Sequence, residues 1–136
     1  MDVIRKVDYF KIQTPNRAGQ GARILNSLRK DGVNMLAFSG FPRGRGAQID
    51  FIPENTAAFK KAAKRAGLKL SPKKTGFLVQ GEDRIGAVAQ VLTKLADVKI
   101  NVTAIDALSA GGGRWGAILW VKARDISRAA KALQAR

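Results

Sequence analysis

The sequence contains the same pattern twice, and this repeat restricts the possible folds more than any other feature of the chain. Shifting the sequence by about 67 positions places identical apolar, glycine and arginine residues on one another. The identical pairs are Phe10 and Phe77, Gln13 and Gln80, Arg17 and Arg84, Gly19 and Gly86, Ala22 and Ala89, Leu25 and Leu92, Leu28 and Leu95, Asn34 and Asn101, and Ala37 and Ala104. The repeat predicts two copies of one small folding unit, formed by residues 1–72 and residues 73–136.

Hydrophobic periodicity predicts the same order of elements in both copies: strand, helix, strand, strand and helix. In the first copy, strands are expected at Tyr9 to Gln13, Met35 to Phe41 and Gln48 to Ile52, and helices around Ile24 to Leu28 and at Ala57 to Ala66, the latter capped by Asn55 or Thr56. In the second copy, strands are expected at Phe77 to Gln80, Asn101 to Leu108 and Trp115 to Val121, and helices near Ala87 to Ala96 and after the capping residue Asp125. This order predicts an α+β fold of two ferredoxin-like βαββαβ repeats, each with helices on one face of an antiparallel sheet.

The last strand of each repeat differs between the copies. Leu68 to Ser71 is expected to close the sheet of the first copy, whereas the second copy ends at Arg136, directly after its second helix. The segment Val3 to Val7 favours a strand and has no other assignment. Because an unpaired sheet edge is unfavourable, we expect Val3 to Val7 to pair with the sheet of the second copy.

The loop between the first strand and the first helix is the most informative local feature of each copy. Its sequence is Thr14-Pro15-Asn16-Arg17-Ala18-Gly19 in the first copy and Gly81-Glu82-Asp83-Arg84-Ile85-Gly86 in the second. The Gly that follows the Asn or Asp by three residues permits a close approach of the backbone. A ligand carboxylate can then bind the exposed N–H groups of the helix N-terminus. The alternative is that the Asn or Asp caps the helix and no ligand binds.

These loops resemble those of the ACT domain, a small regulatory module that binds amino acids in many metabolic enzymes. The Asp-Arg-Ile-Gly sequence at 83–86 is similar to the Asp-Arg-Pro-Gly-like signature of the family, with Ile85 in place of Pro, and Asn-Arg-Ala-Gly at 16–19 differs at the same position. The segments at 32–34 and 99–101 resemble the family's approach to its second strand, and the similarity extends from Tyr9 to the end of the chain.

The resemblance implies a tandem ACT domain protein whose two modules join side by side and bind an amino-acid effector at their interface. The ligand-binding residues that it implies are Asn16, Arg17, Gly19, Asn34, Asp83, Arg84, Gly86 and Asn101. For Asn34 and Asn101, ordinary turn chemistry at the entry to a strand is an equally good interpretation. The resemblance also implies regulation of a separate enzyme, and a homodimer is a further possible assembly.

The chain lacks both cysteine and histidine, and this excludes most catalytic and metal sites. Disulfides, the usual zinc sites and the Ser-His-Asp and Cys-His arrangements all require one of these residues. Asp50 and Asp106, at strand ends, show no spacing typical of acid–base or metal chemistry. We therefore expect a protein without enzymatic activity, cofactor or metal. The absence of an apolar leader or spanning segment predicts a cytoplasmic protein that does not enter a membrane.

The positive charge supports a second interpretation, a protein that binds RNA or another nucleic acid. Lys and Arg number 25 against 10 Asp and Glu, which gives a formal charge of +15 and favours polyanionic partners. RNA-recognition modules share the ferredoxin-like topology, and the segment from Arg114 to Trp120 is similar in part to their base-stacking strand. The first copy has Gln48 to Phe51, including an acid, at the corresponding place.

Trp115 has three interpretations: it stacks a base, borders a ligand pocket or packs in an interface. Strand alternation places it on one face with Ala117 and Leu119, whereas Trp120 faces the other way and is expected in the core. The basic residues are spread evenly, with about 13 in the first half of the sequence and about 12 in the second. The charge therefore indicates no particular surface.

Overall fold

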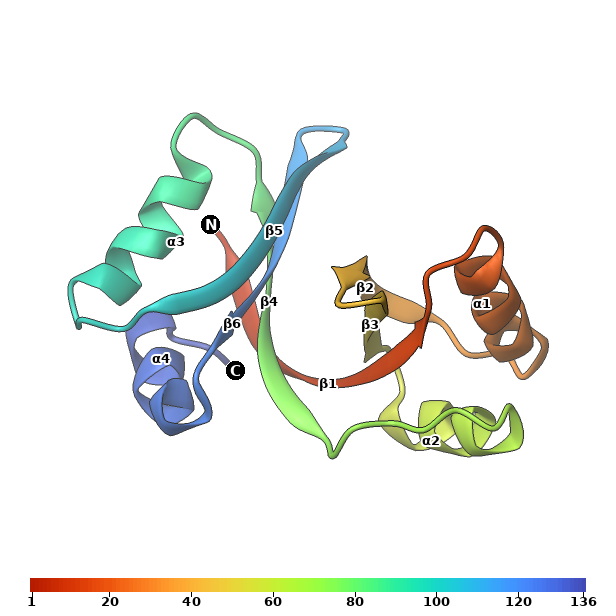
Figure 1. Cartoon of the computed structure of the whole chain (residues 1–136). Helices are drawn as coiled ribbons and strands as arrows, with labels where there is room; N and C mark the ends of the chain where they lie inside the picture. The colour runs from red at the N-terminus through yellow and green to blue at the C-terminus, as the bar shows by residue number, and fades with distance from the viewer. The chain divides into compact units, whose positions relative to one another are not determined.

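The computed structural model describes all of residues 1–136 and contains two compact units (Figure 1). The first unit contains Asp8–Lys74, and the second unit contains Met1–Val7 together with Thr75–Arg136. Each has the predicted ferredoxin-like α+β arrangement, with antiparallel strands and two helices. The sequence divided the chain between residues 72 and 73, whereas residues 1–7 lie in the second unit of the structure.

The first unit consists of the later part of β1 (Val3–Pro15), α1 (Gln20–Lys30), β2 (Met35–Arg43), β3 (Gly46–Pro53) and α2 (Thr56–Arg65). Its strands have the order β2–β3–β1, and both pairings are antiparallel. Phe10 lies opposite Phe51, and both are buried with Leu28 of α1 and Phe59 of α2. The apolar faces of the two helices therefore cover one face of the sheet.

The second unit consists of the start of β1, β4 (Lys74–Glu82), α3 (Ala87–Ala96), β5 (Val102–Gly111), β6 (Arg114–Val121), a 3₁₀ turn (Ala123–Asp125) and α4 (Ile126–Leu133). Its strands have the order β1–β4–β6–β5. Phe77 lies opposite Leu119, and Leu95 of α3 and Leu133 of α4 are buried against them. No helix of the chain is long and apolar enough to span a membrane.

The predicted pairing of Val3 to Val7 with the second repeat is confirmed, because the start of β1 lies beside β4 in the second unit. The N–H of Lys6 donates to the carbonyl of Arg136 at 3.1 Å, and the N–H of Arg136 donates to the carbonyl of Ile4 at 3.0 Å. The sequence predicted two separate strands in this region, but β1 is one continuous strand. No Gly or Pro interrupts the chain before Pro15, so nothing stops the strand between the two predicted segments.

Leu68 to Ser71 does not form the regular closing strand that we predicted. The N–H of Ser71 donates to the carbonyl of Lys11 at 2.9 Å, but the N–H of Lys11 donates to the Ser71 hydroxyl at 3.0 Å instead of to a carbonyl. Pro72 follows and has no N–H to continue the ladder. The segment therefore lies along β1 with a single backbone hydrogen bond of the ladder kind.

The two hairpins differ in length, and this changes the correspondence between the third strands. Ala47 lies opposite Thr14 in the first unit, and Trp115 lies opposite Gly81 in the second. Because Thr14 and Gly81 are equivalent in the repeat, Trp115 corresponds to Ala47 and not to Gln48. The predicted match of Gln48 to Phe51 with the Trp115 strand was wrong by one residue, which exchanges the two faces of the strand.

Candidate functional site

Both loops place a glycine in the left-handed conformation directly before a helix. Gly19 has a φ of 84° before α1, and Gly86 has a φ of 82° before α3. Neither helix has a side-chain cap or an acidic residue in its first turn, so Asn16 and Asp83 do not cap the helices as the alternative required. The first N–H groups of both helices therefore have no side-chain acceptor, although such groups favour negative charge.

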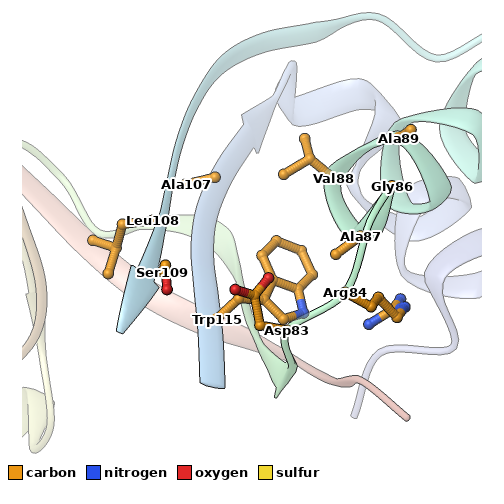
Figure 2. Close-up of a pocket in the computed structure, with 10 residues that line it drawn as sticks. All are labelled: Asp83, Arg84, Gly86, Ala87, Val88, Ala89, Ala107, Leu108, Ser109 and Trp115. Atoms are coloured by element: carbon orange, nitrogen blue, oxygen red, sulfur yellow. The ribbon is translucent and has the colours of Figure 1, made fainter. Parts of the chain in front are cut away.

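The loop of the second unit borders a pocket of about 330 Å³ (Figure 2). The pocket lies between this loop, the first turn of α3 and the later residues of β5, and the Trp115 indole lies between the β5 and α3 residues. Its lining residues are Asp83, Arg84, Gly86, Ala87, Val88, Ala89, Ala107, Leu108, Ser109 and Trp115. The pocket thus combines one acidic side chain, a helix N-terminus and several apolar surfaces.

Arg84 is held by a carboxylate from the start of the chain. Its Nη1 and Nη2 donate to Asp2 Oδ1 at 3.0 Å and to Asp2 Oδ2 at 2.9 Å, and it also donates to the Glu82 carbonyl and the Gln90 amide oxygen. Trp115 Nε1 donates to Asp2 Oδ1 at 3.0 Å. The Asp2 side chain is 9% exposed, so this bidentate pair is largely shielded from solvent on the Asp2 side.

The electrostatics of the pair follow from these hydrogen bonds. Donation from Arg84 lowers the pKa of Asp2 below its ordinary value, and donation from Trp115 acts in the same direction, while burial opposes both. The hydrogen bonds to Asp2 also raise the pKa of Arg84. Asp2 fits because Gly81 has no side chain: a Cβ at Gly81 would lie 2.0 Å from Asp2 Oδ1.

The first unit has an equivalent pocket of about 250 Å³. Eight of its lining residues occupy the positions of residues in the second pocket. The pairs are Asn16 and Asp83, Arg17 and Arg84, Gln20 and Ala87, Gly21 and Val88, Gly40 and Ala107, Phe41 and Leu108, Pro42 and Ser109, and Ala47 and Trp115. Arg17 is exposed and its side chain has no partner, whereas Arg84 is fully engaged.

A comparison of the sequence with models of known protein families gives a match that agrees with the fold and the loops. The family model described as ACT domain matches residues 76–136. The second unit is an ACT domain. The first unit repeats the same strand and helix order and the same loop geometry, so the chain has a tandem ACT-like architecture.

Solved structures share this fold over nearly the whole chain. Protein BT0572 from Bacteroides thetaiotaomicron superposes with a TM-score of 0.78 at 14% identity, covering 98% of this chain and 88% of that chain. The ligand-free regulatory subunit of aspartate kinase from Thermus thermophilus superposes with a TM-score of 0.65 at 15% identity, covering 98% and 94%. At these identities the similarity shows the tandem fold. Among curated proteins, no sequence match is found.

Asn34 and Asn101 lie away from the loop pockets. Asn34 immediately precedes β2 and Asn101 immediately precedes β5, whereas the pockets are lined by later residues of these two strands. From Asn34 to Gly40 the strand spans roughly 20 Å, at about 3.3 Å per residue. The Asn34 amide donates to Glu54 Oε2 at 3.3 Å, a side-chain contact with a residue 20 positions later in the chain. Of the eight predicted ligand-binding residues, therefore, only the six in the loops line or adjoin the pockets.

Trp115 cannot stack a base in this ACT domain. It is 4% exposed and packs with Ala117 and Leu119 in the core between the sheet and the helices. The face that the RNA interpretation required is therefore covered by α3 and α4. Trp120, on the other face of β6, is also buried, as expected.

Sequence reasoning missed the residue that binds Arg84. Asp2 is 82 positions away from Arg84, and no local pattern connects them. The available signal was the expected pairing of Val3 to Val7 with the second sheet, since this pairing brings Asp2 to the end of β4. No three acidic side chains gather in a group that could hold a metal ion.

Proposed function

We propose that this protein is a non-catalytic regulatory module that binds a small amino acid in the pocket of its ACT domain. The observation that carries the proposal is that the pocket of about 330 Å³ joins an unpaired carboxylate to an uncapped helix N-terminus. The Asp83 side chain is exposed and makes no hydrogen bond or ion pair, while its backbone N–H donates to the carbonyl of Gly113. An amino acid offers one charge of each sign, and this pocket offers the two complementary groups.

In this proposal, the two charged ends of the ligand bind different walls of the pocket. The α-carboxylate binds the N–H groups at the start of α3, where the helix dipole favours negative charge. The α-ammonium group binds the Asp83 carboxylate. Because Asp2 neutralises Arg84, the pocket has no surplus positive charge to attract a second ligand carboxylate. Val88 and Leu108 are left for the ligand side chain, which favours a small neutral amino acid.

The first unit is proposed as a weaker site for the same class of ligand. Its helix also begins without a cap, but Asn16 replaces the acid and Arg17 adds a free positive charge. This combination retains the carboxylate side of the site and lacks an anionic partner for the ammonium group. We also propose that ligand binding is transmitted to a separate enzyme or to a second copy of the chain, since catalysis is assigned to neither unit.

A thermal-shift screen over the twenty amino acids tests the proposal, followed by titration calorimetry. At a concentration 100 times its Kd, the ligand is expected to stabilise the fold by about 2.7 kcal/mol, which raises Tm by several degrees. Asp83→Asn removes the partner of the ammonium group and is expected to abolish the shift. Asp97→Asn is the matched control, because Asp97 is an exposed acid at the other end of α3.

Two results contradict the proposal. If no amino acid raises Tm, the pocket does not bind this class of ligand. If Asp83→Asn and Asp97→Asn bind the ligand equally well, Asp83 is not the ammonium partner and the site lies elsewhere.

A further inference from the structure

Folding concentrates positive charge that is evenly spread along the sequence. The first unit contains 14 Lys and Arg against 4 Asp and Glu, a formal charge of +10. The second unit contains 11 against 6, a formal charge of +5. The difference arises because the first unit includes the three lysines at 69–74, which outweigh the loss of Arg5, Lys6 and Asp2 with the start of β1. The amino-acid site uses none of this surplus.

The two helices of the first unit carry half of its basic residues and no acidic residue. The basic residues are Arg23, Arg29 and Lys30 of α1, and Lys60, Lys61, Lys64 and Arg65 of α2. All seven are exposed, and we call them the basic helix surface. Only Arg29 and Arg65 have side-chain partners, which are Asn26 and Asp31. The ion pair of Arg65 with Asp31, at 3.3 Å, brings the last turn of α2 to the end of α1.

The second unit shows that the fold does not require this charge. Its helices keep the apolar positions of the first unit but change most of the seven basic ones. The residues at the equivalent positions are Gln90, Ala96 and Asp97 after the start of α3, and Ser127, Arg128, Lys131 and Ala132 in α4. Of these seven residues in the second unit, two are basic and one is acidic. Since the same architecture forms with these residues, the charge of the basic helix surface is not explained by folding.

We propose that the basic helix surface binds the phosphate backbone of a nucleic-acid duplex without reading its sequence. Seven exposed cations without an intervening helix acid match the high density of phosphate charge on a duplex. Single strands are bound chiefly by aromatic stacking, and the one aromatic residue of these helices, Phe59, is fully buried. Four of the seven cations are Lys, which contacts phosphate as a point charge, and contacts to phosphate carry no sequence information.

The residues between the cations argue against an acidic protein as the partner. Protein interfaces are centred on buried aromatic or apolar residues. The exposed residues that separate the cations are small or polar, namely Ala22, Asn26, Ser27, Ala57, Ala58 and Ala66. Duplex-binding surfaces are polar and strongly positive, which is the composition observed here.

Fluorescence anisotropy with a labelled DNA duplex of about 24 base pairs tests the proposal over a range of salt concentrations. The variant R23Q/R29A/K60S/R65A replaces four basic residues by the second unit's own residues at the equivalent positions. The control K94Q/K122Q/R124Q/K131Q removes the same number of charges from exposed residues of the second unit. Circular dichroism confirms that both variants are folded.

The intact protein is expected to bind the duplex with an affinity that falls steeply as salt increases, with a log–log slope of about −0.9 for each phosphate contacted. The basic-surface variant is expected to reduce the magnitude of this slope by about 2 or more and to weaken binding at least tenfold at roughly 100 mM salt. The control is expected to change the affinity by less than about threefold.

Three outcomes overturn the proposal. No duplex binding at about 50 mM salt excludes the activity. An equal loss in both variants shows attraction by net charge without a defined surface. Tighter binding of a single strand of the same sequence, or of polyglutamate, assigns the surface to another class of partner. None of these outcomes depends on amino-acid binding.

Discussion

The two loops have the same backbone and different electrostatics. Gly19 and Gly86 differ by only 2° in φ, and eight equivalent residues line the two pockets. Nevertheless, Arg84 is fixed by Asp2, whereas Arg17 has no partner. The comparison shows that a glycine and a helix start determine the shape of the loop, while the charge available in it depends on the segment that lies alongside.

That segment differs because β1 serves both units. Its start lies beside β4 in the second unit and brings Asp2 next to Gly81, which has no side chain in the way. The equivalent of Gly81 in the first unit is Thr14, and no acidic side chain bonds to Arg17. The pairing that completes the second sheet therefore also neutralises its loop arginine.

We expect the largest effect on stability from replacing Trp115, which occupies the position of Ala47 in the first unit. Trp115→Ala, which copies the first unit, is expected to destabilise the protein by about 3–5 kcal/mol because it empties a large buried volume. It also removes the hydrogen bond to Asp2. Urea unfolding gives the free energy, and hydrogen exchange at the amides of α3 and β6 locates the loss in the second unit.

Trp115→Phe is the matched control, because it keeps an aromatic ring and removes the N–H donor. Its expected cost is about 1–2 kcal/mol. If Trp115→Ala costs less than about 1 kcal/mol, the indole does not fill the core as described.

Removing the charge of Asp2 is expected to lower the free energy of unfolding by a smaller amount, and this loss depends on pH. Asp2→Asn keeps an oxygen for Trp115 and loses the charge that pairs with Arg84. Because folding lowers the pKa of Asp2 below its ordinary value of 3.8, its stabilisation is fully present above pH 3.8 and is lost as the pH falls through the folded pKa. The variant is therefore expected to be less stable than the parent at pH 6, and the gap is expected to narrow below pH 3.8.

Urea unfolding of both proteins at pH 6, pH 4 and pH 3 measures this gap. Asp97→Asn, an exposed acid without a side-chain partner, is expected to show no such convergence. A constant gap between Asp2→Asn and the parent at all three values would show that the charge on Asp2 does not stabilise the fold.

Most of the fold follows from the repeat because the repeated residues are those that fill the cores. Phe10, Leu28 and their counterparts Phe77 and Leu95 are buried at equivalent places, and the helix predicted at Ala87 to Ala96 has those bounds. Local signals also identified the Asn55 cap, whose side chain accepts from the N–H of Ala58 at 2.9 Å. Asp125 precedes α4 without a capping hydrogen bond and instead accepts from Arg128.

The parts that the sequence did not reveal depend on residues far apart in the chain. The pairing of Asp2 with Arg84 joins the start of β1 to a loop 82 positions later. The one-residue difference between the hairpins places Trp115 opposite Gly81, and the sequence alignment of the repeats did not detect it. Asn34 and Asn101 match in the repeat because both precede a strand, and this local role gives no information about the distance to the loops.

We expect the smallest effect on stability from replacing Arg17, and the same substitution at Arg84 provides the comparison. Arg17→Ala is expected to leave the free energy of unfolding unchanged within about 0.5 kcal/mol, since the side chain is exposed and has no partner. Arg84→Ala removes the bidentate partner of Asp2 and is expected to accelerate hydrogen exchange at Val3 and Ile4, the residues that follow Asp2. Hydrogen exchange measured by NMR on both variants separates a local release of β1 from general destabilisation. If Arg17→Ala loosens the start of β1 as much as Arg84→Ala does, the ion pair is not what holds the strand, and the difference between the loops has no effect on the fold.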